Sequence, residues 1–366
     1  MIYLNNSTTT KVDERLVKII EKYSTQEYGV ATSDYSSGFE MKSKEAVESA
    51  KKIIAEKISG QPGEIFFTSG QSESNTQVLR GLGKGHIITT KIEHSSILEA
   101  CKALEKDGYS VTYLDVDEEG KIILDQLKKS LRKDTFLVTI QHANQEVGTI
   151  QEIEKIGKNC RESRVLFHVD ASQSFLKEQI NVEKMNIDLL TIAAHLIHGP
   201  KGVGALYARR GILLKPLIYG SRVLDIPGIA GFGEAARLWK EEDNEKMRKQ
   251  TKRLLREIGK IPKTIIFTPA DSLPNILSVG FKFIEGEAIV LYLDSEGIVL
   301  STGSACSGKG LKPSHVLEAM GFGEEDSHGS IRISLSRYTT DEEIDIAIEK
   351  LKEVVGKLRE MSPIKG

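Results

Sequence analysis

Short apolar runs that recur between amphipathic helical stretches constrain the fold of this chain more than any other feature. The strand-like runs are His86–Thr90, Val111–Val116, Phe136–Ile140, Val165–Val169, Leu189–Ala193 and Val203–Tyr207. Most are continuous rather than alternating in polarity, which is typical of strands that helices cover on both faces. Helical stretches precede or separate several of them, at residues 46–58, Ser96–Glu105, Leu124–Leu131 and Ile153–Arg161. This βαβ order predicts an α/β fold with a mostly parallel central sheet.

The pattern changes near residues 226–233. Trp239–Ile261 is long, charged and helical in spacing, as expected for a connection between domains. Beyond it lie the strand-like runs Leu277–Phe281, Ile298–Leu300 and Ile331–Leu335, a helix at 286–293, and a last helix that opens after Thr340 with a capping box. We therefore predict a large α/β domain at residues 15–235 and a smaller α+β domain built from residues 1–14 and 236–366.

Composition narrows the class of protein. Hydrophobic residues make up 39% of the chain and charged residues 28%, and the formal net charge is -2. This balance gives no electrostatic reason to expect nucleic acid or an anionic membrane as a partner. The first residues lack the features of a signal peptide, so we expect a cytoplasmic protein. Cys101, Cys160 and Cys306 are odd in number and far apart, which predicts free thiols rather than a disulfide framework.

Polar residues cluster where several of the predicted strands end. They are Glu93-His94, His142-Ala143-Asn144, the segment from His168 to Gln173, and His195. Taken singly, each is most simply a capping group. In open α/β sheets, however, ligands bind beyond the carboxyl ends of the strands. Clusters that follow several strands together therefore indicate a binding site.

These segments, together with Thr68–Asn75, resemble the NifS/IscS-like cysteine desulfurases of the class V aminotransferase family. The resemblance runs from Tyr3 to about Met361 and implies the fold of type I transferases that depend on pyridoxal phosphate (PLP). It also implies a set of cofactor contacts: Ser72 in the phosphate-end turn, His94 stacked on the pyridine ring, Asn144 on the substrate side, Asp170 at the pyridinium nitrogen, Gln173 at the ring oxygen, and His195.

The resemblance extends to the second domain. The segment from Leu300 to Ser307 resembles the loop that carries the family's sulfur-accepting cysteine, here Cys306. Small residues on both sides favour an exposed, nucleophilic thiol. Arg332 is expected to hold a substrate carboxylate by a forked pair of hydrogen bonds. Cys101 and Cys160 lie in helical patterns, so we expect them in the core.

The chain departs from the family at the cofactor. Leu196 stands where the family's Schiff-base lysine is implied, and leucine can neither form that bond nor move a proton. Ala193 replaces a phosphate-binding serine, and Tyr219–Pro227 is shorter than the family's glycine-rich loop and lacks its threonine. Val30-Ala31 and Tyr35 replace the family's Asn-Pro and His. Each hydrogen bond lost to the phosphate costs roughly 1.5–3 kcal/mol, so we expect weak, noncovalent PLP at best.

Three functions are consistent with this pattern. The first is a desulfurase-like protein of iron–sulfur cluster assembly and sulfur transfer, with little or no PLP-dependent turnover, in which Cys306 accepts sulfur or shares a cluster with a scaffold protein. The second is an active PLP enzyme in which His195, His198 or Lys201 replaces the lysine. The third is a catalytically silent subunit that pairs with an active paralogue. The resemblance itself implies a homodimer, whereas the third function requires pairing with the paralogue.

Overall fold

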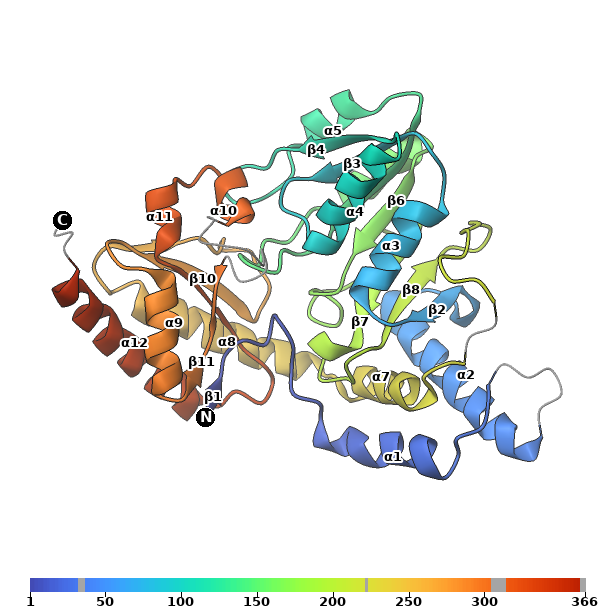
Figure 1. Ribbon diagram of the computed structural model, residues 1–366, viewed down its shortest axis with the longest axis horizontal. Helices are drawn as coiled ribbons and strands as arrows, with labels where there is room; N and C mark the ends of the chain where they lie inside the picture. The colour runs from blue at the N-terminus through green and yellow to red at the C-terminus, as the bar shows by residue number, and fades with distance from the viewer. Residues whose placement is uncertain (32–36, 221–222, 304–313, 363–366) are drawn as a thin grey trace.

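A seven-stranded sheet forms the centre of the computed structural model, which describes residues 1–31, 37–220, 223–303 and 314–362 (Figure 1). Its strands lie in the order β2 (Ile65–Thr68), β8 (Gly204–Ala208), β7 (Leu189–Ala193), β6 (Leu166–Asp170), β5 (Thr135–Gln141), β3 (His86–Thr90) and β4 (Ser110–Leu114). From β7 to β4 every pairing is parallel, and β8 pairs antiparallel with both β7 and β2. The predicted α/β fold with a mostly parallel sheet is confirmed.

Helices cover both faces of this sheet. Along β3, β5 and β7, the side chains of Ile87, Leu137 and Leu189 pack with α3 (Gln71–Gly81) and α4 (Ser95–Lys106). Their neighbours in sequence face the opposite way, as the two-residue period of a strand requires. These neighbours pack in the core that contains α2 (Gly38–Ile58), α5 (Leu124–Ser130), α6 (Ile153–Glu162) and α7 (Ile226–Leu238). Burial on both faces is the physical reason that the runs are continuous in the sequence.

Several elements were not predicted, among them strand β2 and the helices α3 and α7. The sequence of α7 contains several glycines, which disfavour helix, whereas Pro227 lies in its first turn, where proline is tolerated. Packing explains α7: a Cβ on Gly233 would lie 2.8 Å from the Cβ of Ala50, so the glycine permits α7 and α2 to lie in close contact. The long helix expected at 239–261 is α8 (Glu241–Ile258), and the extended residue Trp239 separates it from α7.

A second, four-stranded sheet is antiparallel, in the order β12 (Ser301–Thr302), β13 (Ser330–Ser334), β10 (Ile276–Phe281) and β9 (Thr264–Ile266). Helix α9 (Gly286–Ser295) packs beside it, and α12 (Asp341–Met361) packs on α9 and α8. The predicted capping box of Thr340 and Glu343 at the start of α12 is confirmed. The short helices α10 (His315–Ala319) and α11 (Glu324–His328) precede β13. The domain boundaries stay a prediction.

The N-terminal segment connects the two sheets. Strand β1 (Ile2–Tyr3) pairs parallel with β11 (Ile298–Val299), and Asn5 bridges to Ser334. The chain then crosses to the large sheet, where the short helix η1 (Glu14–Leu16) and α1 (Val17–Thr25) follow (Figure 1).

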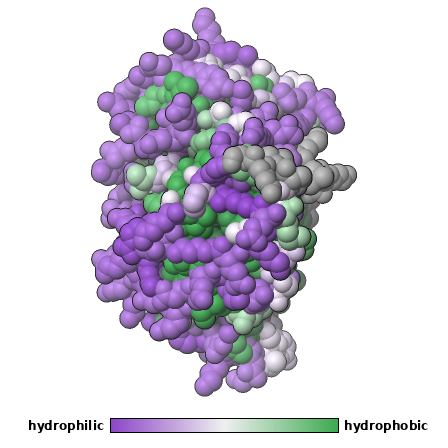
Figure 2. Space-filling model, turned by 90° about the vertical axis from the view of Figure 1, so that its left-hand side faces the viewer, coloured by the Kyte–Doolittle hydropathy of each residue, from purple (hydrophilic) through white to green (hydrophobic). Residues whose placement is uncertain are grey.

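The outer side of the C-terminal part carries a hollow between α9, α11 and α12. It has a volume of about 770 Å³, and its walls include apolar residues such as Phe283, Ile284 and Leu358 beside Glu285 and Glu324. Figure 2 looks onto this side and shows hydrophobic side chains in its middle, surrounded by hydrophilic ones. Among the described residues, no helix has the length and apolar character needed to cross a membrane.

A buried ion pair fastens the N-terminal segment to the end of the chain. The side chains of Asp13 and Arg337 are 2% and 3% exposed, and Arg337 donates to the Asp13 carboxylate. Asp13 also accepts from Arg15 and from the Tyr338 hydroxyl. Burial acts to raise the pKa of Asp13, but hydrogen bonds from Arg15 and Tyr338 and the charge of Arg337 outweigh it and hold the pKa below its ordinary range.

Asp13→Asn is expected to destabilise the protein by about 3–5 kcal/mol, because it removes the carboxylate to which the buried Arg337 donates and leaves only Asp243, at 3.7 Å, as a counter-charge. A carboxylate whose pKa is lowered by folding contributes its full stabilisation above its unfolded pKa of ~4. The difference in the free energy of unfolding between wild type and variant should therefore shrink as the pH falls below ~4. Urea denaturation at several pH values measures this. Glu14→Gln, which removes an exposed ion pair with Lys11, is the control and should change stability by less than about 1 kcal/mol. Equal effects of the two variants would contradict the assignment.

Candidate functional site

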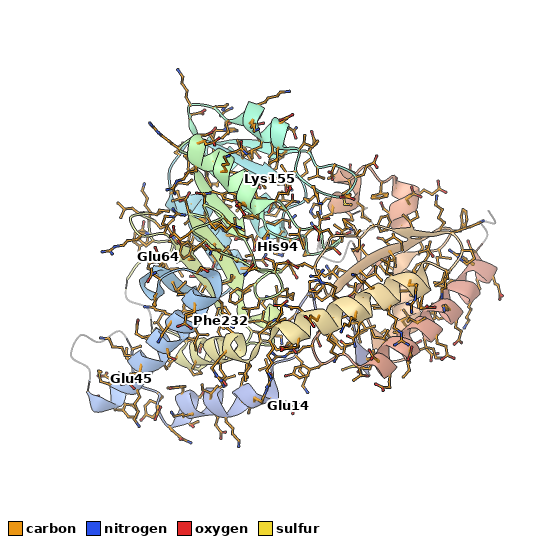
Figure 3. All side chains as sticks on the ribbon, turned by 180° about the vertical axis from the view of Figure 1, so that it is seen from behind. Glu14, Glu45, Glu64, His94, Lys155 and Phe232 are labelled. Carbon is orange, nitrogen blue, oxygen red and sulfur yellow. The ribbon has the colours of Figure 1, made fainter. Side chains whose placement is uncertain are left out.

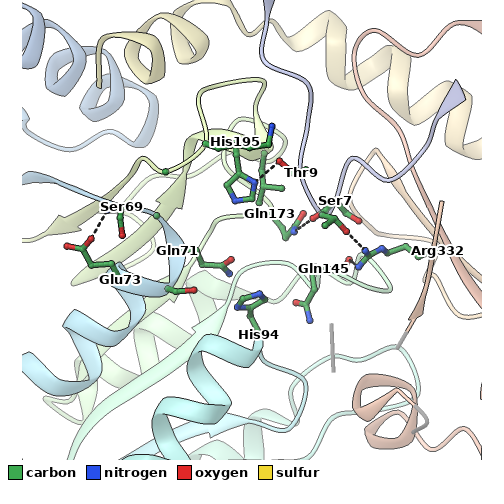
Figure 4. Close-up of a pocket in the computed structure, with 16 residues that line it drawn as sticks. Ser7, Thr9, Ser69, Gln71, Glu73, His94, Gln145, Gln173, His195 and Arg332 are labelled. Atoms are coloured by element: carbon green, nitrogen blue, oxygen red, sulfur yellow. Dashed lines mark hydrogen bonds between the residues drawn. The ribbon is translucent and has the colours of Figure 1, made fainter. Parts of the chain in front are cut away.

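A cavity of about 520 Å³ lies where the carboxyl ends of the central strands meet the N-terminal segment and β13. Figure 4 shows side chains from distant parts of the chain pointing toward it, and Figure 3 shows His94 near the middle of the molecule, between the two sheets. Five of the predicted site residues line it: Ser72, His94, Gln173, His195 and Arg332. The cavity also contains residues that the sequence did not single out, among them Gln71 and Gln145.

The first turn of α3 forms one end of the cavity. Gly70, with φ of 141°, precedes the helix, and Gln71, Ser72 and Glu73 follow it along the wall. A Cβ on Gly204 of β8 would lie 2.7 Å from the Cα of Gly70, so glycine is required there for the turn to approach the sheet. The free N–H groups and dipole of a helix start favour an anion, and Ser72 adds a hydroxyl donor.

His94 and Gln173 form the sides of the cavity. His94 caps α4: its Nδ1 accepts from the backbone N–H of Ser96 at 3.2 Å, which places the ring proton on Nε2. Burial lowers the pKa of His94, so the ring is neutral near pH 7. Gln173 donates its Nε2 to the Ser7 carbonyl at 2.8 Å. Its buried Oε1 has no hydrogen-bond partner in the part of the chain that the structure describes.

Asp170 lies at the end of β6, 4% exposed, directly behind the cavity wall. Its Oδ1 accepts from the backbone N–H and the hydroxyl of Ser172, at 3.0 and 2.7 Å. Its Oδ2 accepts from the Gln71 and Asn75 amides, each at 2.7 Å. Asp170 is therefore surrounded by neutral donors of its own chain.

The short helix η3 (Ala194–Leu196) brings His195 and Leu196 to the cavity. Burial, with the charges of Lys177 and Lys201, lowers the pKa of His195 to about 4, so its ring is neutral, and its Nδ1 lies 3.3 Å from the Thr9 hydroxyl. Leu196 is 2% exposed. Lys177 is buried behind it and donates its Nζ to the Leu196 carbonyl at 3.2 Å; burial lowers the pKa of Lys177 to about 7.

The other two candidate bases differ in position. Lys201 lines the cavity, and its Nζ lies 3.4 Å from the Thr10 carbonyl. His198 lines a different cavity, with its Nδ1 2.8 Å from the Lys11 carbonyl and its ring against Trp239 and Tyr338. The geometry therefore offers Lys201 and His195, rather than His198, to a molecule in the main cavity.

Arg332 is a buried cation at the opposite end from α3. It is 1% exposed and donates to the Gln145 carbonyl at 3.0 Å and to the Thr8 hydroxyl at 2.8 Å. Among the described residues, no carboxylate forms an ion pair with it. Glu146 lies nearby, but burial raises the pKa of that carboxyl to about 7 against the opposing effects of Ser314 and Arg332. An anionic group in the cavity would therefore complete the pairing of Arg332.

Asn144, the predicted substrate-side residue, lies in a turn beside the cavity, and its role stays a prediction. Its Oδ1 accepts from the backbone N–H groups of Glu146 and Val147, and its Nδ2 donates to the Ile92 carbonyl at 3.1 Å. The fully buried side chain thus shapes the turn, and the next residue, Gln145, reaches the cavity instead. The two neighbours could not be distinguished from sequence, because which one faces inward depends on the turn. Cys306 and Tyr35 lie outside the described residues, as do 221–222 of the shortened segment.

PLP held as in the family does not fit these residues. The position of the covalent anchor is apolar Leu196, and Ala193, fully buried, offers no hydroxyl. The Asp170 carboxylate, which would have to accept from the ring nitrogen, already accepts four hydrogen bonds, two of them from amides. The α3 start and Ser72 do suit a phosphate. The cavity is thus suited to an anionic ligand, without the covalent anchor.

Comparison with known proteins identifies the family. A family model described as Aminotransferase class-V matches residues 2–346. A protein named cysteine desulfurase IscS from Methanosarcina thermophila is 42% identical over 381 residues, which cover 99% of this chain and 94% of the relative. A protein named cysteine desulfurase from Nostoc sp. is 43% identical over 386 residues, which cover 100% of this chain and 96% of the relative.

Solved structures agree. One described as a NifS-like protein superposes with a TM-score of 0.91 at 36% identity and covers 98% of this chain and 100% of that one. One described as SspA in complex with cysteine has a TM-score of 0.84 at 32% identity and covers 93% of this chain and 100% of that one. The chain therefore belongs to the aminotransferase class-V family, among relatives that are named cysteine desulfurases of the IscS and NifS-like kind.

Proposed function

We propose that this protein is a desulfurase-like member of the family that takes part in sulfur transfer and iron–sulfur cluster assembly without PLP-dependent turnover of cysteine. The single observation that carries the proposal is Leu196, an apolar side chain in the wall of the cavity at the position of the family's lysine. A second observation supports it: Asp170 is satisfied by Gln71, Asn75 and Ser172.

The proposed chemistry rests on Cys306. As a sulfur acceptor, its thiolate attacks the terminal sulfur of a persulfide on a donor; a new S–S bond forms at Cys306, and the donor leaves as a thiolate. As a cluster ligand, the same thiolate binds iron together with ligands of a scaffold protein. Neither step requires a lysine or an electron sink, so both are compatible with Leu196.

A second candidate function is an active PLP enzyme with a substitute amine. Lys201 favours it, because this lysine lines the cavity on the same side as Leu196. His195, neutral near pH 7, is the available base beside it. This candidate requires a covalent adduct at Lys201, which distinguishes it from the first.

A homodimer is part of the proposal. In the segment that precedes α7, Leu213, Tyr219 and Val223 are 90%, 84% and 83% exposed. Large hydrophobic side chains that are exposed in one segment are compatible with an interaction surface. By resemblance, we propose that the partner subunit packs against this segment, and the same surface would serve a silent subunit that pairs with an active paralogue.

The purified protein with excess PLP and cysteine is expected to give no borohydride-reducible adduct and no sulfide, because the described cavity offers no amine at position 196. Absorbance spectra before and after borohydride, with a sulfide assay, measure this. An adduct that disappears in Lys201→Ala, together with sulfide release, would instead establish the second candidate.

Thiol titration of the folded protein is expected to find one rapidly reacting cysteine out of three. Cys101 and Cys160 are 0% and 1% exposed, and burial raises the pKa of each thiol to about 12. The rapid reaction with a chromogenic aromatic disulfide should therefore belong to Cys306 and vanish in Cys306→Ser, while all three thiols react in denaturant. Rapid reaction that survives Cys306→Ser would show that the proposed nucleophile is not the accessible thiol.

An iron–sulfur scaffold protein from the same organism is expected to co-elute with this protein in anaerobic gel filtration, with cluster absorbance in the shared peak. Cys306→Ser should reduce that absorbance or the labelled sulfur transferred from a persulfide donor, because it removes the thiolate. Cys101→Ala, which removes a fully buried thiol, is the control. No co-elution, and identical behaviour of all variants, would refute the proposal.

A further inference from the structure

The carboxylate of Asp170 is hydrogen-bonded to capacity by its own chain. A carboxylate has about four lone-pair sites. Ser172 occupies two of them at Oδ1, through its backbone N–H and its hydroxyl, and the Gln71 and Asn75 amides donate to Oδ2. All four donors are neutral, and no ion pair to Asp170 occurs among the described residues. The buried charge is thus stabilised without a cationic ligand.

Gln71 differs from the other donors in position. Asn75 and Ser172 are fully buried, whereas Gln71 is part of the cavity wall. Figure 4 shows the Gln71 side chain extending from the start of α3 toward the middle of the cavity, on the side of His94. Its amide therefore covers the carboxylate on the side that faces the cavity.

The rest of the network keeps Asp170 and His94 in fixed positions. The Asn75 amide donates to both Asp170 and the Ser96 hydroxyl, at 2.7 and 2.8 Å, and the Ser96 hydroxyl lies 2.8 Å from His94 Nδ1. A ring nitrogen that approaches Asp170 between His94 and Leu196 must therefore displace Gln71, because Asn75 is held from two sides. Displacement removes a hydrogen bond to a charged group.

We propose that Gln71 is a specificity-determining residue that excludes pyridine-ring ligands from Asp170, independently of the missing lysine. Its Nε2 takes the place that a protonated ring nitrogen would occupy at Oδ2. This inference deepens the proposed function, on which it rests: the cavity is closed to the family's cofactor at the ring as well as at the covalent anchor. Restoring a lysine at position 196 alone is then insufficient to restore binding.

The test uses pyridoxamine 5′-phosphate, which has the ring and phosphate of PLP but cannot form a Schiff base. Its affinity for the full-length protein is measured by calorimetry in the wild type, Gln71→Ala and Gln71→Met. Gln71→Ala is expected to bind about ten- to a hundredfold more tightly, because Asp170 regains a free acceptor for the ring nitrogen. Gln71→Met fills similar space without an amide and therefore separates the effect of the hydrogen bond from that of side-chain volume. Tighter binding of pyridoxamine 5′-phosphate to Gln71→Met than to the wild type shows that the amide excludes the ring.

Gln126→Ala is the matched control, since it removes a glutamine that donates to another carboxylate, Asp115, outside the cavity lining. It should leave the affinity within about twofold of wild type. Thermal denaturation of each variant checks folding. A second experiment compares the single variant Leu196→Lys with the double variant that also carries Gln71→Ala. Each is incubated with micromolar PLP and treated with borohydride, and only the double variant should accumulate the reduced adduct.

Equal affinity of wild type and Gln71→Ala, or full adduct formation in Leu196→Lys alone, would overturn the inference. A failure of the proposed function looks different: the wild type would itself release sulfide from cysteine, whatever the ratio of affinities between the Gln71 variants.

Discussion

A parallel sheet that helices cover on both faces has one place for polar chemistry, and the rest of this structure depends on that constraint. Strand interiors from β3 to β7 are mostly apolar because both faces are buried, and neutral polar side chains among them, such as Thr139 and His168, hydrogen-bond to one another. Charged and amide side chains are therefore confined to the strand ends, where Asp170 and Gln173 follow β6 and His195 follows β7. The cavity forms at this edge because the N-terminal segment and β13 close it from the other side.

Much of the architecture could be predicted from sequence, since hydrophobic periodicity reports burial directly. Strands β3 and β7 have the predicted bounds, and the α12 cap was recognised from Thr340 and Glu343. Helix α7 was missed because its glycines disfavour helix locally and are tolerated only through contact with α2. Such a contact has no signature within the segment itself.

Part of the site was also predictable, but from the family resemblance rather than from hydrophobic periodicity. Resemblance identified residues one by one, and several of them do line the cavity. It did not reveal Gln71, because a hydrogen bond between residues 99 positions apart leaves no local pattern. Nor did it indicate that Gln145, rather than its neighbour Asn144, lies in the cavity wall, because the geometry of the turn decides which of the two faces inward. What a family pattern transmits well is the backbone; the contacts of individual side chains have to be read from the structure.

The N-terminal segment has a consequence for how the protein can be made. Asn6 and Ser7 hydrogen-bond with Ser334, and Asp13 pairs with Arg337, so these residues are synthesised more than 320 positions before their partners. Contacts of such long range form late. The large sheet can assemble during translation, whereas the cavity, which needs Thr8 beside Arg332, can close only after β13 has been synthesised. A nascent chain therefore carries an open site until β13 has emerged from the ribosome.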